Sequence, residues 1–223
     1  MTRILTCHTR FGPDRQALFI SIMALTWAFA FDVVGETREL PEPALPAIVV
    51  RTYDAADTPT EFQQSALLVA SAILDRAGVS VRWMRCDPNA FTAECRNPLG
   101  AYELAVRLIK LRERPSKSTL PLGEANIDVV RRTGSLATVY ANRVRWFADA
   151  SSVDFATVLG RAIAHEIGHL LIGTTMHPAT GLMRGIWAPK DVAGEDWVFA
   201  DGDALALRQA CRVRAQGFAD RTS

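Results

Sequence analysis

The sequence lacks any long block of charges of one sign, because its 25 basic and 24 acidic residues nearly cancel along 223 residues. This balance gives no reason to expect binding to nucleic acid or to an anionic membrane surface. Internal repeats and low-complexity tracts are also absent, and the composition, 49% hydrophobic and 22% charged, is ordinary for a globular protein. We therefore expect one globular, monomeric domain that does not bind nucleic acid.

Hydrophobic runs are short. The apolar run from Ala17 to Phe31 has fifteen residues, whereas a bilayer-spanning helix needs about 20. Three arginines, at positions 3, 10 and 15, precede this run, and Ala28-Phe29-Ala30 supplies the small-x-small pattern that signal peptidase prefers. The pattern predicts that residues 1–30 are an export signal and residues 31–223 the mature domain. Cleavage would give a secreted or periplasmic protein without stable membrane association, whereas an uncleaved run would be a membrane anchor.

Cysteine is scarce, with four residues in the chain. Cys7 would leave with the predicted signal, and export would place the other three in an oxidising compartment. Cys86 and Cys95 bracket a short polar loop whose closure is easy, so we predict a disulfide between them. Cys211 is left without a partner, and we expect it to be a small buried residue on a C-terminal helix.

Alternating and β-branched segments predict a sheet of four or five strands. We expect the strands at residues 47–53, 79–84, 102–111, 127–130 and 136–140, with a loop over residues 112–126. A capping box, Thr58-Pro59-Thr60-Glu61, begins a helix that ends at Gly78 and turns an apolar stripe toward the sheet.

A second helix is predicted from Asp154, a suitable N-cap, to Gly173, a suitable terminator. Its apolar residues lie on more than one face, so we expect it to be buried between the sheet and the last 50 residues. The segment beyond Met183 is irregular and rich in Gly, Pro and Trp, and a final helix is predicted at residues 203–214. Trp187 and Trp197 of this segment could line a cleft, although such tryptophans are more often core residues.

Histidine is as scarce as cysteine, yet three of the four histidines lie within thirteen residues, at positions 165, 169 and 177. His165 and His169 are one turn apart on the predicted helix, so both imidazoles can reach one metal ion, and Glu166 lies beside them. Structural zinc sites fill four positions with Cys or His, whereas catalytic sites use three protein ligands and leave one position for water. With three histidines and no nearby cysteine, the pattern predicts a catalytic Zn2+ site in which Glu166 accepts a proton from water.

The stretch from residue 165 to residue 183 resembles the motif of the metzincin metallopeptidases, His-Glu-x-x-His-x-x-Gly-x-x-His followed by a Met-turn. The resemblance implies zinc binding by His165, His169 and His177, general-base catalysis by Glu166, a helix-ending turn at Gly173 and a Met-turn at Met183. It also implies an α+β fold, in which a twisted mixed sheet of four or five strands carries a backing helix and an active-site helix. The N-terminal lobe would span residues 31–173, and a small irregular C-terminal lobe ending in a helix would span residues 174–223.

The motif departs from the family pattern at two places. One extra residue precedes Gly173 and another follows it, so His177 lies two positions later than the family's third histidine. The loop after Gly173 must bring His177 back to the metal, and Glu195 or Asp196 is the alternative third ligand. The tyrosine that some metzincins place two residues after the methionine is replaced by Gly185, so transition-state stabilisation by that tyrosine is not expected.

These expectations together predict an exported zinc-dependent metalloendopeptidase that acts on a protein or peptide substrate. The first alternative is a non-catalytic secreted domain of the same fold, with zinc as a structural staple and a binding partner in the cleft. The second is a membrane-anchored interaction protein whose histidines are coincidental. Glu166 favours catalysis, because a purely structural zinc site does not need this glutamate.

Overall fold

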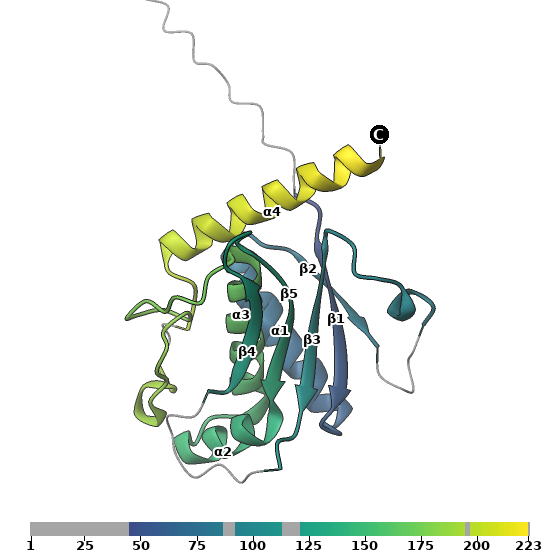
Figure 1. The fold of residues 1–223 in the computed structure, drawn as a ribbon. Helices are drawn as coiled ribbons and strands as arrows, with labels where there is room; N and C mark the ends of the chain where they lie inside the picture. Colours follow the sequence, from purple (N-terminus) through teal and green to yellow (C-terminus); the bar gives the residue numbers. More distant parts are fainter. Residues whose placement is uncertain (1–44, 87–91, 113–120, 195–196, 223) are drawn as a thin grey trace, which may run out of the picture. The chain divides into compact units, whose positions relative to one another are not determined.

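The chain folds into a five-stranded mixed sheet with helices α1 and α3 packed side by side on one face (Figure 1). This computed structural model describes residues 45–86, 92–112, 121–194 and 197–222. The predicted export signal and the alternative ligands Glu195 and Asp196 lie outside the described residues. No helix in the described ranges is long and apolar enough to cross a bilayer.

The sheet has the order β2-β1-β3-β5-β4. Its strands are β1 (Ile48–Ala55), β2 (Val81–Arg85), β3 (Glu103–Ile109), β4 (Gly123–Asp128) and β5 (Thr133–Tyr140). The pairs β1–β2, β1–β3 and β3–β5 are parallel, whereas β4 runs antiparallel to β5 and forms one edge. The register of β4 shifts between Asn126 and Ile127. The predicted mixed sheet is therefore confirmed, and its antiparallel edge strand β4 packs against α3, the helix that carries His165 and His169.

Four helices and two short 3-10 turns accompany the sheet in the described part of the chain. The helices are α1 (Thr60–Arg76), α2 (Ala141–Ser151), α3 (Phe155–Ile172) and α4 (Asp201–Thr222), and the turns are η1 (Glu94–Arg96) and η2 (Pro189–Asp191). Buried side chains that alternate along β1, β3 and β5 meet α1 and α3 in the core; they include Ile48, Val50, Leu104, Val106, Ala137 and Val139. This alternation is the period-two pattern from which the strands were predicted.

Helix α1 begins differently from the expected capping box. Pro59 is its N-cap, and no side chain caps the first turn. The turn before the helix is instead held by the carboxylate of Asp54, which accepts hydrogen bonds from the backbone N–H groups of Ala56 and Thr58, each at 2.7 Å. The Asp54 carboxylate accepts the hydrogen bonds of this turn, and the Thr58 side chain does not cap the helix. The predicted capping role of Thr58 was therefore wrong.

Two elements near the edge of the sheet differ from the prediction. Strand β4 begins at Gly123, inside the segment expected to be a loop, because small residues alternate with exposed polar ones there and give a weak strand pattern. Helix α2 was not predicted; it follows β5 directly, with Tyr140 as an N-cap that makes no side-chain capping bond. Without a capping residue or an intervening turn, the change from strand to helix carries no local signal.

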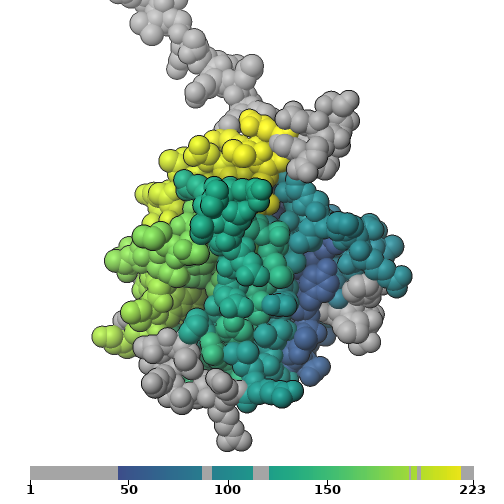
Figure 2. All heavy atoms as spheres, in the orientation of Figure 1, coloured from purple at the N-terminus to yellow at the C-terminus, as the bar shows by residue number. Residues whose placement is uncertain are grey.

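Helix α4 crosses the end of the sheet where the parallel strands begin, and it is visible in yellow in Figures 1 and 2. Arg214 of α4 donates hydrogen bonds to the carbonyl groups of Ala101, at 3.1 Å, and Gly134, at 2.7 Å. The hydroxyl group of Tyr102 donates to the carbonyl of Cys211 at 3.2 Å, and Cys211 is buried and free, as expected. At the opposite end of β2, Cys86 and Cys95 form the predicted disulfide.

Candidate metal centre

Helix α3 carries two of the three histidines on one face. Asp154 caps the helix by accepting a hydrogen bond from the backbone N–H of Thr157 at 2.8 Å. His165 and His169 follow one turn apart, and both are buried, with 7% and 4% of their surfaces exposed. The helix thus fixes the spacing of these two imidazoles before any other part of the site is added.

Each of these histidines is oriented by a backbone carbonyl group. Nδ1 of His165 lies 2.8 Å from the carbonyl oxygen of Leu182, and Nδ1 of His169 lies 2.7 Å from that of Thr174. A carbonyl oxygen only accepts, so each Nδ1 carries the proton and donates it, which leaves a lone pair on Nε2. This is the tautomer that a metal-binding histidine requires, and the hydrogen bond from Nδ1 to the carbonyl group holds the ring in place.

The third histidine, His177, completes a cluster with the first two. Nε2 of His169 lies 3.0 Å from Nε2 of His165 and 3.0 Å from Nε2 of His177. The three ligand nitrogens all lie within 4.8 Å of one another. Two ligand nitrogens of a tetrahedral zinc site are about 3.3 Å apart for Zn–N bonds of about 2.0 Å. Facing lone pairs at such distances repel unless a cation lies between them, so the donor set fits a zinc ion.

Burial keeps the imidazoles neutral. The pKa of His165 is lowered to about 3, mainly because burial disfavours the charged ring, with the neighbouring histidines adding to the shift. Burial also lowers the pKa values of His169 and His177. Neutral rings with free lone pairs are the form in which histidine binds metal ions.

The loop after α3 absorbs the two extra residues of the motif. Gly173 ends the helix with φ of 68°, and a side chain at this position would collide with the carbonyl group of Arg132. The next carbonyl group, that of Thr174, turns back to His169, and the chain then returns His177 to the cluster. A Cβ atom on Gly185 would lie 3.0 Å from Cβ of His177, so the glycine in the tyrosine's position leaves room for this histidine.

Glu166 lies beside the histidines but is not one of the clustered ligands. Its side chain is buried, with 5% of its surface exposed, and its carboxylate contacts the position of Gly123 on β4. Burial, with a smaller contribution from Glu124, raises the pKa of Glu166 to about 8. A carboxylate in such surroundings can accept and release a proton near neutral pH.

Met183 packs beneath the helical turn that carries the histidines. It is 1% exposed, and a Cβ atom on Gly168 would lie 2.7 Å from its sulfur and 2.7 Å from the ring of Phe199. The preceding residue, Leu182, supplies the carbonyl group that orients His165. The structure therefore places Met183 in the segment that supports the site, and its role as a Met-turn stays a prediction.

A cavity of about 430 Å³ lies in front of the cluster. Its walls come from the edge strand β4, helix α2, helix α3 and the segment around residues 175–187. Many of the lining side chains are apolar, namely Leu122, Ala125, Ile127, Phe147, Ala162, Ile186 and Trp187. In Figure 2 the yellow-green C-terminal segment and the teal strands meet on the face shown.

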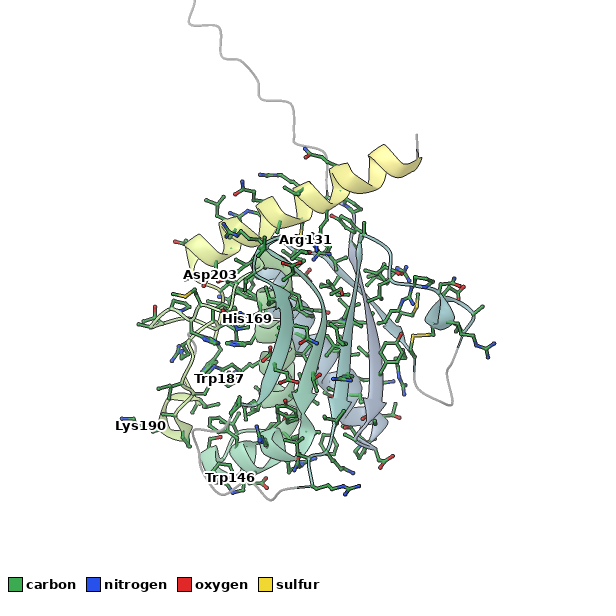
Figure 3. The ribbon with its side chains drawn as sticks, in the orientation of Figure 1. Arg131, Trp146, His169, Trp187, Lys190 and Asp203 are labelled. Atoms are coloured by element: carbon green, nitrogen blue, oxygen red, sulfur yellow. A yellow bond between two sulfur atoms is a disulfide. The ribbon has the colours of Figure 1, made fainter. Side chains whose placement is uncertain are left out.

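Trp187 links this wall to the histidine cluster. Its ring centroid lies 5.7 Å from that of His165 and 4.5 Å from that of Trp197, and Figure 3 shows it on the same side of α3 as His169. Trp187 therefore both packs in the core and lines the cavity, whereas Trp197 is a core residue. Phe147 of α2 and Gly123 of β4 belong to the cavity but were not predicted, because α2 was missed and Gly123 lies in the part of β4 that was expected to be a loop.

The comparisons with known proteins do not show the function of this chain. No protein-family profile matches the chain, and no curated protein matches it. One similar solved structure is a zinc-dependent peptidase from Methanocorpusculum labreanum, with a TM-score of 0.48 and 14% sequence identity over 71% of this chain and 99% of that one. A similarity of this degree says nothing about the substrate or reaction of this chain.

Proposed function

We propose that this protein is a zinc-dependent peptidase whose metal is held by His165, His169 and His177. The main support for the proposal is that three histidine Nε2 atoms converge next to a buried glutamate at the edge of a cavity. Backbone carbonyl groups orient two of the three rings. Three protein ligands leave a fourth position for water, which is the arrangement of catalytic zinc sites.

In the proposed reaction, bound zinc would polarise a water molecule and lower its pKa to about 7. Glu166 would accept a proton from the attacking water and pass it to the leaving amine. Its buried position suits this role, since burial makes the protonated form of the carboxyl group accessible near neutral pH. Burial keeps His165 and His169 neutral, and their Nδ1–H groups donate to carbonyl groups, which leaves Nε2 of each ring free for the metal.

The substrate that fits this site is an extended polypeptide. Strand β4 is the edge of the sheet and lines the cavity, so its outer backbone groups are available to pair with an added strand. The apolar wall formed by Leu122, Phe147 and Trp187 favours an apolar substrate side chain next to the scissile bond. An endopeptidase of metzincin type, with an expanded loop between the second and third histidines, is the specific form that we propose.

We also propose that the protein is exported and acts outside the cytoplasm as a monomer. The disulfide between Cys86 and Cys95 supports an oxidising compartment, where such bonds form and persist. The predicted cleavage near Ala30 would be checked by mass spectrometry of the protein recovered from the periplasm or culture medium.

The test of the proposed function is metal analysis together with cleavage of a mixed peptide library. We expect one zinc per chain and cleavage that is abolished in Glu166→Gln, with the metal retained. Glu61→Gln is the matched control, because Glu61 is an exposed carboxylate in the first turn of α1. Wild-type protein that holds zinc but cleaves no peptide would contradict the proposal and favour a zinc-stabilised binding domain.

A further inference from the structure

Gly123 lies at the point where the edge strand comes closest to Glu166. It is the first residue of β4 and pairs with Val139 of β5, whose side chain is fully buried on the face covered by the helices. A Cβ atom on Gly123 would lie 2.6 Å from Oε1 of Glu166 and 2.8 Å from the carbonyl oxygen of Thr138. Such distances are below any ordinary van der Waals contact, so a side chain at this position and the observed carboxylate exclude each other.

The backbone conformation does not explain this glycine. Among the described residues, the glycines with positive φ are Gly78, Gly173 and Gly181, and Gly123 is not one of them. A glycine within a strand has no side chain to pack and weakens the strand, so it often marks a site where another group approaches closely. Here the groups that approach are the carboxylate of Glu166 and the carbonyl oxygen of Thr138.

We propose that Gly123 is a positioning residue of the site: its missing side chain is the space in which the Glu166 carboxylate lies between α3 and β4. The consequence for catalysis rests on the proposed peptidase function, whereas the positioning itself does not. A methyl group at position 123 would turn the carboxylate away or push β4 outward. Either movement displaces the proton acceptor relative to the cavity, and a displacement of about 1 Å can slow a reaction about 100-fold.

The direct test measures stability rather than activity. We would compare the melting temperatures of wild type, Gly123→Ala, Glu166→Ala and the double variant, all in metal-free form. Truncating Glu166 removes the carboxylate but leaves the Thr138 carbonyl, so Gly123→Ala should lower the melting temperature less in the Glu166→Ala background than in wild type, and the remaining loss is due to the Thr138 carbonyl. An equal loss in both backgrounds would overturn the proposal. If Gly123→Ala alone does not fold, the double variant should, and its failure to fold would overturn the proposal as well.

Gly134 supplies a matched control. It lies in the neighbouring strand β5 and is equally crowded, since a Cβ atom there would lie 2.7 Å from both the Asn126 carbonyl oxygen and a methyl group of Leu170. Gly134→Ala should therefore lower the melting temperature by the same amount whether or not Glu166 is truncated. A dependence on Glu166 as large as that of Gly123→Ala would contradict the proposal.

A second readout separates this proposal from the proposed function. Zinc-loaded Gly123→Ala should keep one zinc per chain, because the histidine ligands are retained, and lose kcat by about 10- to 100-fold, because the proton acceptor is displaced. If wild type cleaves peptides and Gly123→Ala keeps the wild-type kcat, the proposal fails while the proposed function stands. If no form cleaves peptides, the proposed function fails and the melting experiment alone decides the role of Gly123.

Discussion

The Nε2 atoms of His169 and His177 lie 3.0 Å apart, although the two histidines are eight positions apart and the end of a helix lies between them. The helix ends at Ile172, the left-handed Gly173 reverses the chain, and the carbonyl group of Thr174 returns to His169. Both residues added to the motif are thus accommodated in one turn and one short loop. His177 reaches the cluster because the loop after Gly173 folds back against His169.

Removal of the third ligand should weaken the metal site. We expect His177→Ala to lower zinc affinity by more than about 100-fold, since the loss of an outer partner of a ligand already costs 10- to 100-fold. Competition with a chromophoric chelator measures this affinity. Met176→Ala is the control, because Met176 is a neighbour in the same loop with 75% of its surface exposed. Zinc bound as tightly by His177→Ala as by wild type would show that another group is the third ligand.

Filling the space beneath the histidines' helix should destabilise the protein. A Cβ atom on Gly168 would lie 2.7 Å from the sulfur of Met183, so we expect Gly168→Ala to cost about 1–3 kcal/mol through overpacking. Urea unfolding measures the change. Gly202→Ala is the control, since no atom lies within 4 Å of its Cβ position, and it should be neutral or slightly stabilising. Equal effects of the two substitutions would contradict the observed packing.

The disulfide should contribute to stability without supporting the metal centre. Cys86 and Cys95 are nine positions apart, and closing a loop of this size stabilises a fold by about 2–3 kcal/mol. The double variant Cys86→Ser/Cys95→Ser should lose about that free energy of unfolding and keep one zinc per chain. Zinc loss in a variant of unchanged stability would show that the bond acts on the site instead.

Stability should fall at alkaline pH because of the contact between the sheet and α4. Burial raises the pKa of Tyr102 to about 12 and that of Cys211 to about 11, from ordinary values of 10.0 and 9.0. The unfolded chain therefore releases these protons at lower pH than the folded protein does. The free energy of unfolding keeps its full value below about pH 9 and falls between about pH 9 and 12, as the unfolded chain loses these protons first. Unfolding experiments across this range measure the loss.

Substitution of the tyrosine isolates its part of the alkaline effect. Tyr102→Phe removes the phenolic proton and the hydrogen bond to the carbonyl of Cys211, so it should cost about 1 kcal/mol at pH 8. Its stability should then change less steeply than that of wild type between about pH 10 and 12. An identical alkaline profile would mean that Tyr102 does not contribute to the decline.

Local patterns in the sequence were sufficient where neighbouring residues determine the structure. The spacing of His165 and His169 places both on one face of a helix whatever surrounds it, and Asp154 and Gly173 mark the ends of that helix. The pairing of Cys86 with Cys95 followed from their short separation. The first half of β4 was missed because small and polar residues form it, and α2 was missed because no side chain caps its first turn.

By itself, the sequence determined the candidate metal ligands, the helix that spaces two of them and the glutamate beside them, and it predicted a sheet of four or five strands. Only the tertiary structure decided that His177 meets His169, that Leu182 and Thr174 orient the rings, and that Gly123 leaves space for Glu166. The physical reason is that helical and strand periodicities act over a few residues of chain. Contacts between a loop, an edge strand and a helix depend instead on how distant segments pack, which no local pattern encodes.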